Sequence, residues 1–62
     1  MDWEKRKSLQ EFWDRELKNN TCFTDYGELK SIYILNEDLA EGEFINGAVF
    51  TINLEFINKR NN

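Results

Sequence analysis

The chain has 62 residues with 12 acidic and 8 basic side chains, a net charge of −4, and 15% aromatic residues. This aromatic content is typical of a folded domain and not of a disordered segment. With one cysteine and no histidine, the sequence excludes an internal disulfide, the usual zinc ligand sets and the usual Ser or Cys triads. We therefore expect one small domain, residues 1–62, without a metal, a cofactor or a catalytic site.

The acidic residues are concentrated in the middle of the chain. Residues 19–57 hold seven acidic side chains and one lysine. A negative field repels nucleic acid and favours basic protein surfaces, so we expect no direct binding to nucleic acid. No stretch approaches the ~20 apolar residues of a membrane span, and the polar start lacks the apolar core of a signal peptide. We expect a cytoplasmic protein that does not enter a membrane.

Residues 2–18 form an amphipathic pattern with the period of a helix. Asp2 is the expected N-cap, and charged side chains fill the side opposite the apolar one. The apolar side is wider than a short sheet needs, which leaves two interpretations open for Trp3 and Trp13. They wrap the edge of the sheet, or one of them contacts a second molecule, since tryptophan is enriched at interface hot spots.

Residues 21–35 are ambiguous between strand and helix. Asp25 and Glu28 have the spacing of a capping box, which would begin a helix, whereas the β-branched and aromatic run at residues 32–34 favours a strand. We predict a strand at 29–35, with or without a further strand before it. A turn at 36–38 follows, although one helical turn at 37–41 is an alternative.

Residues 48–57 alternate between apolar and polar side chains, which predicts a strand with one apolar face. It should pair with a strand at 40–45. A two-residue loop would place Glu43 opposite Phe50 on the apolar face, where burial of a carboxylate is unfavourable. A three-residue loop with a left-handed Gly47 pairs Gly42 with Phe50 instead, and we predict this register.

These elements predict an α+β fold: an N-terminal helix packed on an antiparallel meander of three or four strands. We expect the helix to cover the even-numbered face of the strand at 48–57 and residues 58–62 to form a frayed tail. Phe50 would then be a core residue with room above Gly42. On that basis Phe50→Ala should destabilise the fold by about 3–5 kcal/mol.

The acidic residues of the middle region are the candidate binding residues: Asp25, Glu28, Glu37, Asp38, Glu41 and Glu43. They lack the spacing of a calcium loop. We predict a non-enzymatic protein-binding module that inhibits or regulates a larger macromolecule with a basic surface, such as a nucleic-acid-binding protein. Phages and other mobile elements carry accessory proteins of this kind. The alternative is a structural subunit, such as a homodimer, that assembles through helix aromatics and a sheet edge.

Overall fold

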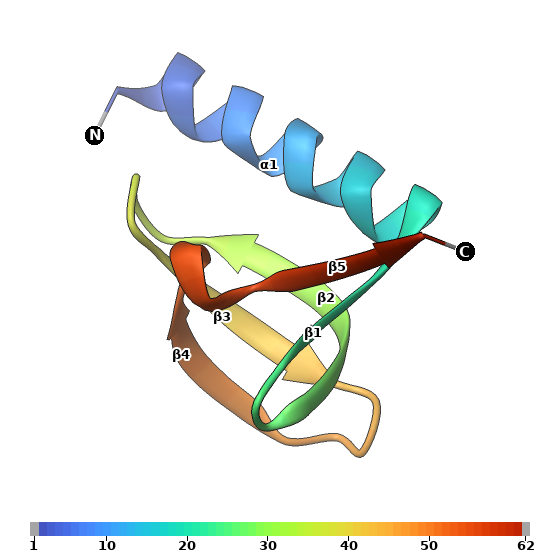
Figure 1. Ribbon diagram of the computed structural model, residues 1–62. Helices are drawn as coiled ribbons and strands as arrows, with labels where there is room; N and C mark the ends of the chain where they lie inside the picture. Colours follow the sequence, from blue (N-terminus) through green and yellow to red (C-terminus); the bar gives the residue numbers. More distant parts are fainter. Residues whose placement is uncertain (1, 62) are drawn as a thin grey trace.

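The computed structural model describes residues 2–61 and shows one helix packed on one antiparallel sheet (Figure 1). The described elements are α1 (Trp3–Asn19), β1 (Asn20–Thr24), β2 (Gly27–Ile34), β3 (Leu39–Phe44), β4 (Val49–Asn53), the 3-10 turn η1 (Leu54–Phe56) and β5 (Asn58–Asn61). The strand order is β4-β3-β2-β1-β5. The predicted α+β fold is confirmed, but the sheet has five strands in these residues and not three or four.

Helix α1 is capped by Asp2, whose side chain accepts a hydrogen bond from the Glu4 backbone N–H at 2.9 Å. Its buried residue is Trp13, and Leu9 and Leu17 pack beside the core. The helix lies on β1 and β2, so the expected position over the strand at 48–57 is wrong. Within residues 2–61 no helix is long and apolar enough to cross a bilayer.

The backbone of β2 changes partners along its length. β1 pairs with it only at Phe23–Glu28 and Thr24–Gly27. Further along, the Gln10 side chain takes the place of a neighbouring strand: its Nε2 donates to the Ile32 carbonyl at 2.6 Å, and its Oε1 accepts from the Ile34 N–H at 2.8 Å. One amide therefore satisfies a donor and an acceptor of β2 and attaches the helix to the sheet.

The predicted hairpin register is confirmed. Gly42 faces Phe50 and Ala40 faces Ile52 across β3 and β4. The loop spans residues 45–47, because the Phe44 N–H donates to the Ala48 carbonyl at 2.8 Å and Gly47 adopts a φ of 92°. Only a residue without Cβ adopts that backbone conformation without strain.

The end of the predicted strand at 48–57 is wrong. β4 stops at Asn53, and η1 turns the chain toward β5. Phe50 is 46% exposed, so its assignment to the core is also wrong. The space above Gly42 is filled by Leu29 and Ile52, whose methyl carbons lie 2.7 and 3.0 Å from where a Cβ would be.

The described end of the chain is a strand and not a frayed tail. β5 pairs with β1 in a continuous register from Asn20–Asn61 to Phe23–Asn58, which places the last strand beside the first (Figure 1). Residue 62 lies outside the described part. The ambiguous region 21–35 forms two strands, β1 and β2. The strand predicted at 29–35 is β2, which begins two residues earlier, at Gly27.

The turn before β3 is closed by a side chain, and it replaces the alternative helical turn at 37–41. Asn36 Oδ1 accepts from the backbone N–H groups of Asp38 and Leu39 at 2.8 and 2.9 Å. The hydrophobic core consists of Trp13, Cys22, Leu29, Ile32, Ile34, Ala40, Phe44, Ile52 and Ile57.

A pair of phenylalanine variants tests where the core lies. Phe44 is 1% exposed and Phe50 is 46% exposed. Phe44→Ala should lower the free energy of unfolding by about 3–5 kcal/mol, and Phe50→Ala by roughly half of that or less. Urea unfolding followed by tryptophan fluorescence measures both values. Equal losses would contradict this assignment of the core.

Gln10→Ala tests the attachment of the helix. It leaves the Ile34 N–H and the Ile32 carbonyl without the side chain that satisfies them, so stability should fall by about 1–3 kcal/mol. Amide hydrogen exchange at Ile34 should also become faster. The matched control is Lys7→Ala, at an exposed position of the same helix, which should change neither quantity.

Candidate functional site

Four of the six predicted acidic residues lie together. Glu41 and Glu43 point outward from β3, and Glu37 and Asp38 occupy the turn that leads into it. We call this surface the acidic sheet face. Glu28 is exposed at the start of β2, and Asp25 lies in the turn between β1 and β2, at the opposite end of the sheet from Glu37.

The carboxylates of β3 have no basic cross-strand neighbours. Glu41 lies between Tyr33 and Thr51, and Glu43 between Ser31 and Val49. The Ser31 hydroxyl donates to Glu43 at 3.3 Å. The cation paired with this surface is Lys5, whose Nζ lies 3.8 Å from Glu37. Both of those side chains are largely exposed, and such a pair contributes little, so the face stays negative.

The two tryptophans of the helix have different environments. Trp13 is 9% exposed and belongs to the core, so little of its surface is open to a partner. Trp3 is 72% exposed. The Arg6 guanidinium lies 5.9 Å from the Trp3 ring and 4.6 Å from the ring of Tyr33 on β2, so it joins both aromatics at the border of the acidic sheet face.

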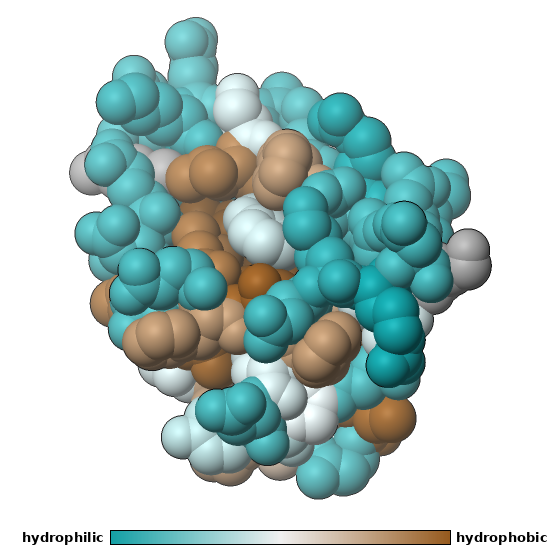
Figure 2. Space-filling model, in the orientation of Figure 1, coloured by the Kyte–Doolittle hydropathy of each residue, from teal (hydrophilic) through white to brown (hydrophobic). Residues whose placement is uncertain are grey.

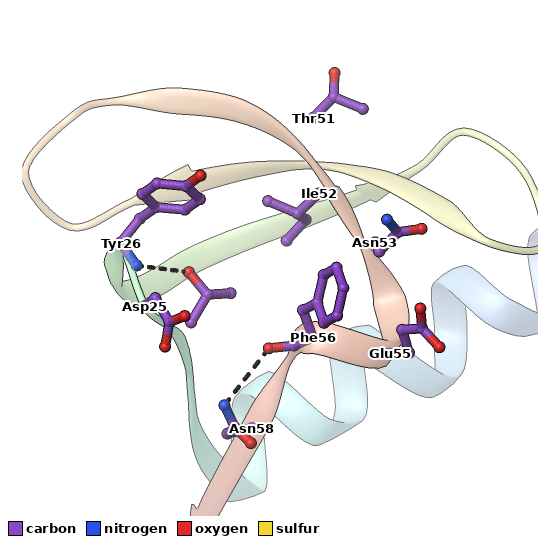
Figure 3. A pocket seen from close by; sticks show the side chains of 9 residues that line it. Asp25, Tyr26, Thr51, Ile52, Asn53, Glu55, Phe56 and Asn58 are labelled. Atoms are coloured by element: carbon purple, nitrogen blue, oxygen red, sulfur yellow. Dashed lines mark hydrogen bonds between the residues drawn. The ribbon is translucent and has the colours of Figure 1, made fainter.

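The structure also contains a groove that the sequence pattern does not reveal. It has a volume of about 680 Å³ and lies between β4, η1, the start of β5 and the β1–β2 turn (Figure 3). Its lining residues are Thr24, Asp25, Tyr26, Thr51, Ile52, Asn53, Glu55, Phe56 and Asn58. We call it the seam groove, because it lies where the two edge strands of the sheet face each other. Asp25 is the predicted acidic residue that it contains.

The groove cannot be predicted from the sequence because the alternating hydrophobic pattern assigns two of the aromatic residues that flank it to a buried face. The alternating pattern places Phe50 and Phe56 on a buried strand face, whereas they are 46% and 61% exposed. Figure 2 shows apolar atoms in the middle of one face of the molecule with hydrophilic atoms around them. The only hint of the groove in the sequence is that it has more aromatic residues than a small core needs. From the sequence, that excess is assigned to the helix and not to the groove.

Cys22 has the properties of a packing residue. It is 1% exposed in the core. Burial raises the pKa of its thiol above the ordinary 9.0; Glu16 also raises this pKa, and Lys59 opposes the shift. A reactive cysteine requires a lowered pKa and access to solvent. Among residues 2–61, no three side chains of the Cys, Asp or Glu type are grouped to hold a metal ion.

Comparison of the chain with protein-family models, with curated proteins and with solved structures finds no match in any of the three. The function must therefore be inferred from the surfaces of the molecule.

The raised pKa of Cys22 has a consequence for stability. The unfolded thiol ionises near pH 9.0, whereas the folded thiol keeps its proton to higher pH, so the folded state binds more protons there. The protonated Cys22 thiol therefore contributes its full stabilisation of the folded state below pH 9.0, and this stabilisation is lost as the pH rises through the folded pKa. Cys22→Ala should thus lose less stability than the wild type between pH 8 and 10.5, as measured by urea unfolding. Parallel curves would contradict the raised pKa.

Proposed function

We propose that the protein is a non-enzymatic binding module that regulates or inhibits a larger macromolecule by covering a basic surface with its acidic sheet face. The observation that carries the proposal is the row of carboxylates along β3 and its preceding turn, with no basic cross-strand neighbour at Glu41 or Glu43. Oriented carboxylates at an uncovered sheet face attract a basic partner from a distance.

The aromatics at the border of this face supply the apolar part of a contact. Tyr33 is 59% exposed, and Val49, next to Glu43 across the sheet, is 52% exposed. Interfaces derive most of their affinity from a few large side chains near the centre, surrounded by polar ones. A partner that covers both the start of the helix and β3 would place Trp3 and Tyr33 within the contact, with the carboxylates beside them.

The proposal extends to the class of partner. A basic surface that binds a nucleic-acid backbone also binds carboxylates at similar positions, so a nucleic-acid-binding protein is the expected partner. Occupation of that surface would inhibit it, as accessory proteins of phages and mobile elements do. A cytoplasmic location belongs to the same proposal and is supported by the unpaired Cys22 thiol in the core.

A second candidate function is a structural or homodimeric subunit. The sheet order leaves β4 and β5 as edges, and an open edge offers unpaired backbone groups to another chain. Light scattering over a tenfold range of concentration separates the two functions. A monomer at all concentrations contradicts assembly through an edge.

Charge reversal tests the acidic sheet face. Glu37→Lys with Glu41→Lys should leave the fold intact, because both side chains are exposed, and should weaken partner capture at least tenfold. Glu4→Lys with Glu11→Lys on the helix makes the same change in net charge and should retain capture. The measurement is affinity purification from the native cell lysate with quantitative mass spectrometry. Capture that is insensitive to salt would contradict the electrostatic mechanism.

A further inference from the structure

The seam groove is built from two edges of the sheet that do not pair with each other. β4 and β5 end the strand order on either side, and η1 carries the chain between them (Figure 1). Ile52, which is 6% exposed, lies between the aromatic side chains that rise on either side (Figure 3). This surface is separate from the β3 carboxylates of the acidic sheet face, since Thr51, which pairs with Glu41, has a side chain that points away from the groove (Figure 3).

Aromatic rings flank the groove and remain open to solvent. Tyr26 is 68% exposed and stacks on Phe50, with ring centroids 5.3 Å apart and an interplanar angle of 28°. Phe44 supports this pair from the core, with its ring edge-on to Phe50 at 5.8 Å. Phe56 stands on η1 with 61% of its surface exposed. Because the stacking fixes Tyr26 and Phe50, little conformational entropy is lost when an apolar side chain packs on them.

The charge of the groove has one sign. Asp25 and Glu55 are among its nine lining residues, and none of the nine is basic. A smaller hollow adjoins it at Asn53 and Glu55 and adds Glu37 and Asp38 to the same side. A ligand with lysine or arginine next to apolar side chains is therefore complementary to this groove.

The backbone of β4 offers hydrogen bonds on the groove side. The Phe44 N–H donates to the Ala48 carbonyl, and bonded pairs alternate along an antiparallel ladder. Residues 48, 50 and 52 consequently direct their backbone groups toward β3, while Val49, Thr51 and Asn53 direct theirs outward. The Leu54 N–H bond to the Asp38 carbonyl, at 2.9 Å, continues the same alternation.

We propose that the seam groove binds an extended peptide segment of a partner protein, which pairs with the free edge of β4. One apolar side chain of the segment packs between Tyr26 and Phe56 over Ile52, and a lysine or arginine two positions along the segment contacts Asp25 or Glu55. The period of two in an extended chain places alternate side chains in the groove, so the recognised sequence has an apolar and a basic residue two positions apart. The site does not depend on the function proposed for the acidic sheet face.

The test is a titration of the isotope-labelled full chain with a blocked hexapeptide of sequence TVTKTV, which places valine and lysine on one face of an extended chain, followed by backbone amide NMR shifts. Saturable shifts at Thr51, Asn53 and Phe56 are expected. A matched hexapeptide with glutamate in place of the lysine should bind at least tenfold more weakly. Absence of shifts at millimolar peptide, equal binding of the two peptides, or shifts confined to Glu41 and Glu43 would overturn the proposal.

Variants identify the groove as the site. Phe56→Ser and Glu55→Lys alter exposed residues and should each weaken binding of the lysine peptide at least tenfold. Ile45→Ser, in the β3–β4 loop with 63% exposure, is the matched control and should bind as the wild type does. Equal binding by all three variants would overturn the proposal.

Backbone pairing and self-association are tested separately. N-methylation of alternate peptide residues removes N–H donors and keeps the side chains, so it should abolish the shifts at Thr51 and Asn53. Retained binding would contradict pairing with β4. Groove shifts that appear on concentrating the protein alone would show that a second copy of this chain occupies the groove, and would overturn the peptide proposal.

Discussion

The fold depends on how the two edges of β2 find hydrogen-bond partners. β3 covers one edge, with a bulge where the register shifts between Leu29 and Ser31. On the other edge β1 pairs over two residues and then diverges to meet β5. At Ile32 and Ile34, where β1 no longer pairs with this edge, the Gln10 side-chain amide forms the hydrogen bonds instead. Because a buried backbone group without a partner is costly, this side chain allows β1 to diverge and the sheet to curl. The helix is thus part of the hydrogen-bonding scheme of the sheet as well as its cover.

Local chemistry explains the parts of the fold that the sequence predicts correctly. The β3–β4 register follows from the position of Gly47 and from the cost of burying Glu43, both of which act within one hairpin. The helix follows from its periodicity and from the Asp2 cap. The acidic sheet face is also a local property, because outward positions of one strand, Glu41 and Glu43, share a face whatever the rest of the chain does.

The parts that the sequence does not predict depend on contacts distant in the chain. β5 has the composition of a tail, Asn58 to Asn61, and becomes a strand because β1 offers it an open edge. Phe50 and Phe56 fit a buried pattern, but the chain turns at η1 before that pattern can be used. The separate environments of Trp3 and Trp13 depend on where the sheet ends beneath the helix. The seam groove combines the first two effects, because Phe56 of η1 and Asn58 of β5 line it, so no single segment contains its signature.

Gly42 couples three positions in the sheet. The volume that a side chain would occupy there is taken by Leu29 from β2 and Ile52 from β4, which approach each other across β3. The three residues share one fixed volume, so a gain at position 42 must be compensated by a loss at position 29 or 52. Single substitutions at these sites should therefore be unfavourable where paired ones are tolerated. Ile52 also lies between the aromatics of the seam groove. The missing side chain at Gly42 on β3 therefore helps to set the shape of the groove, although no residue of β3 lines it.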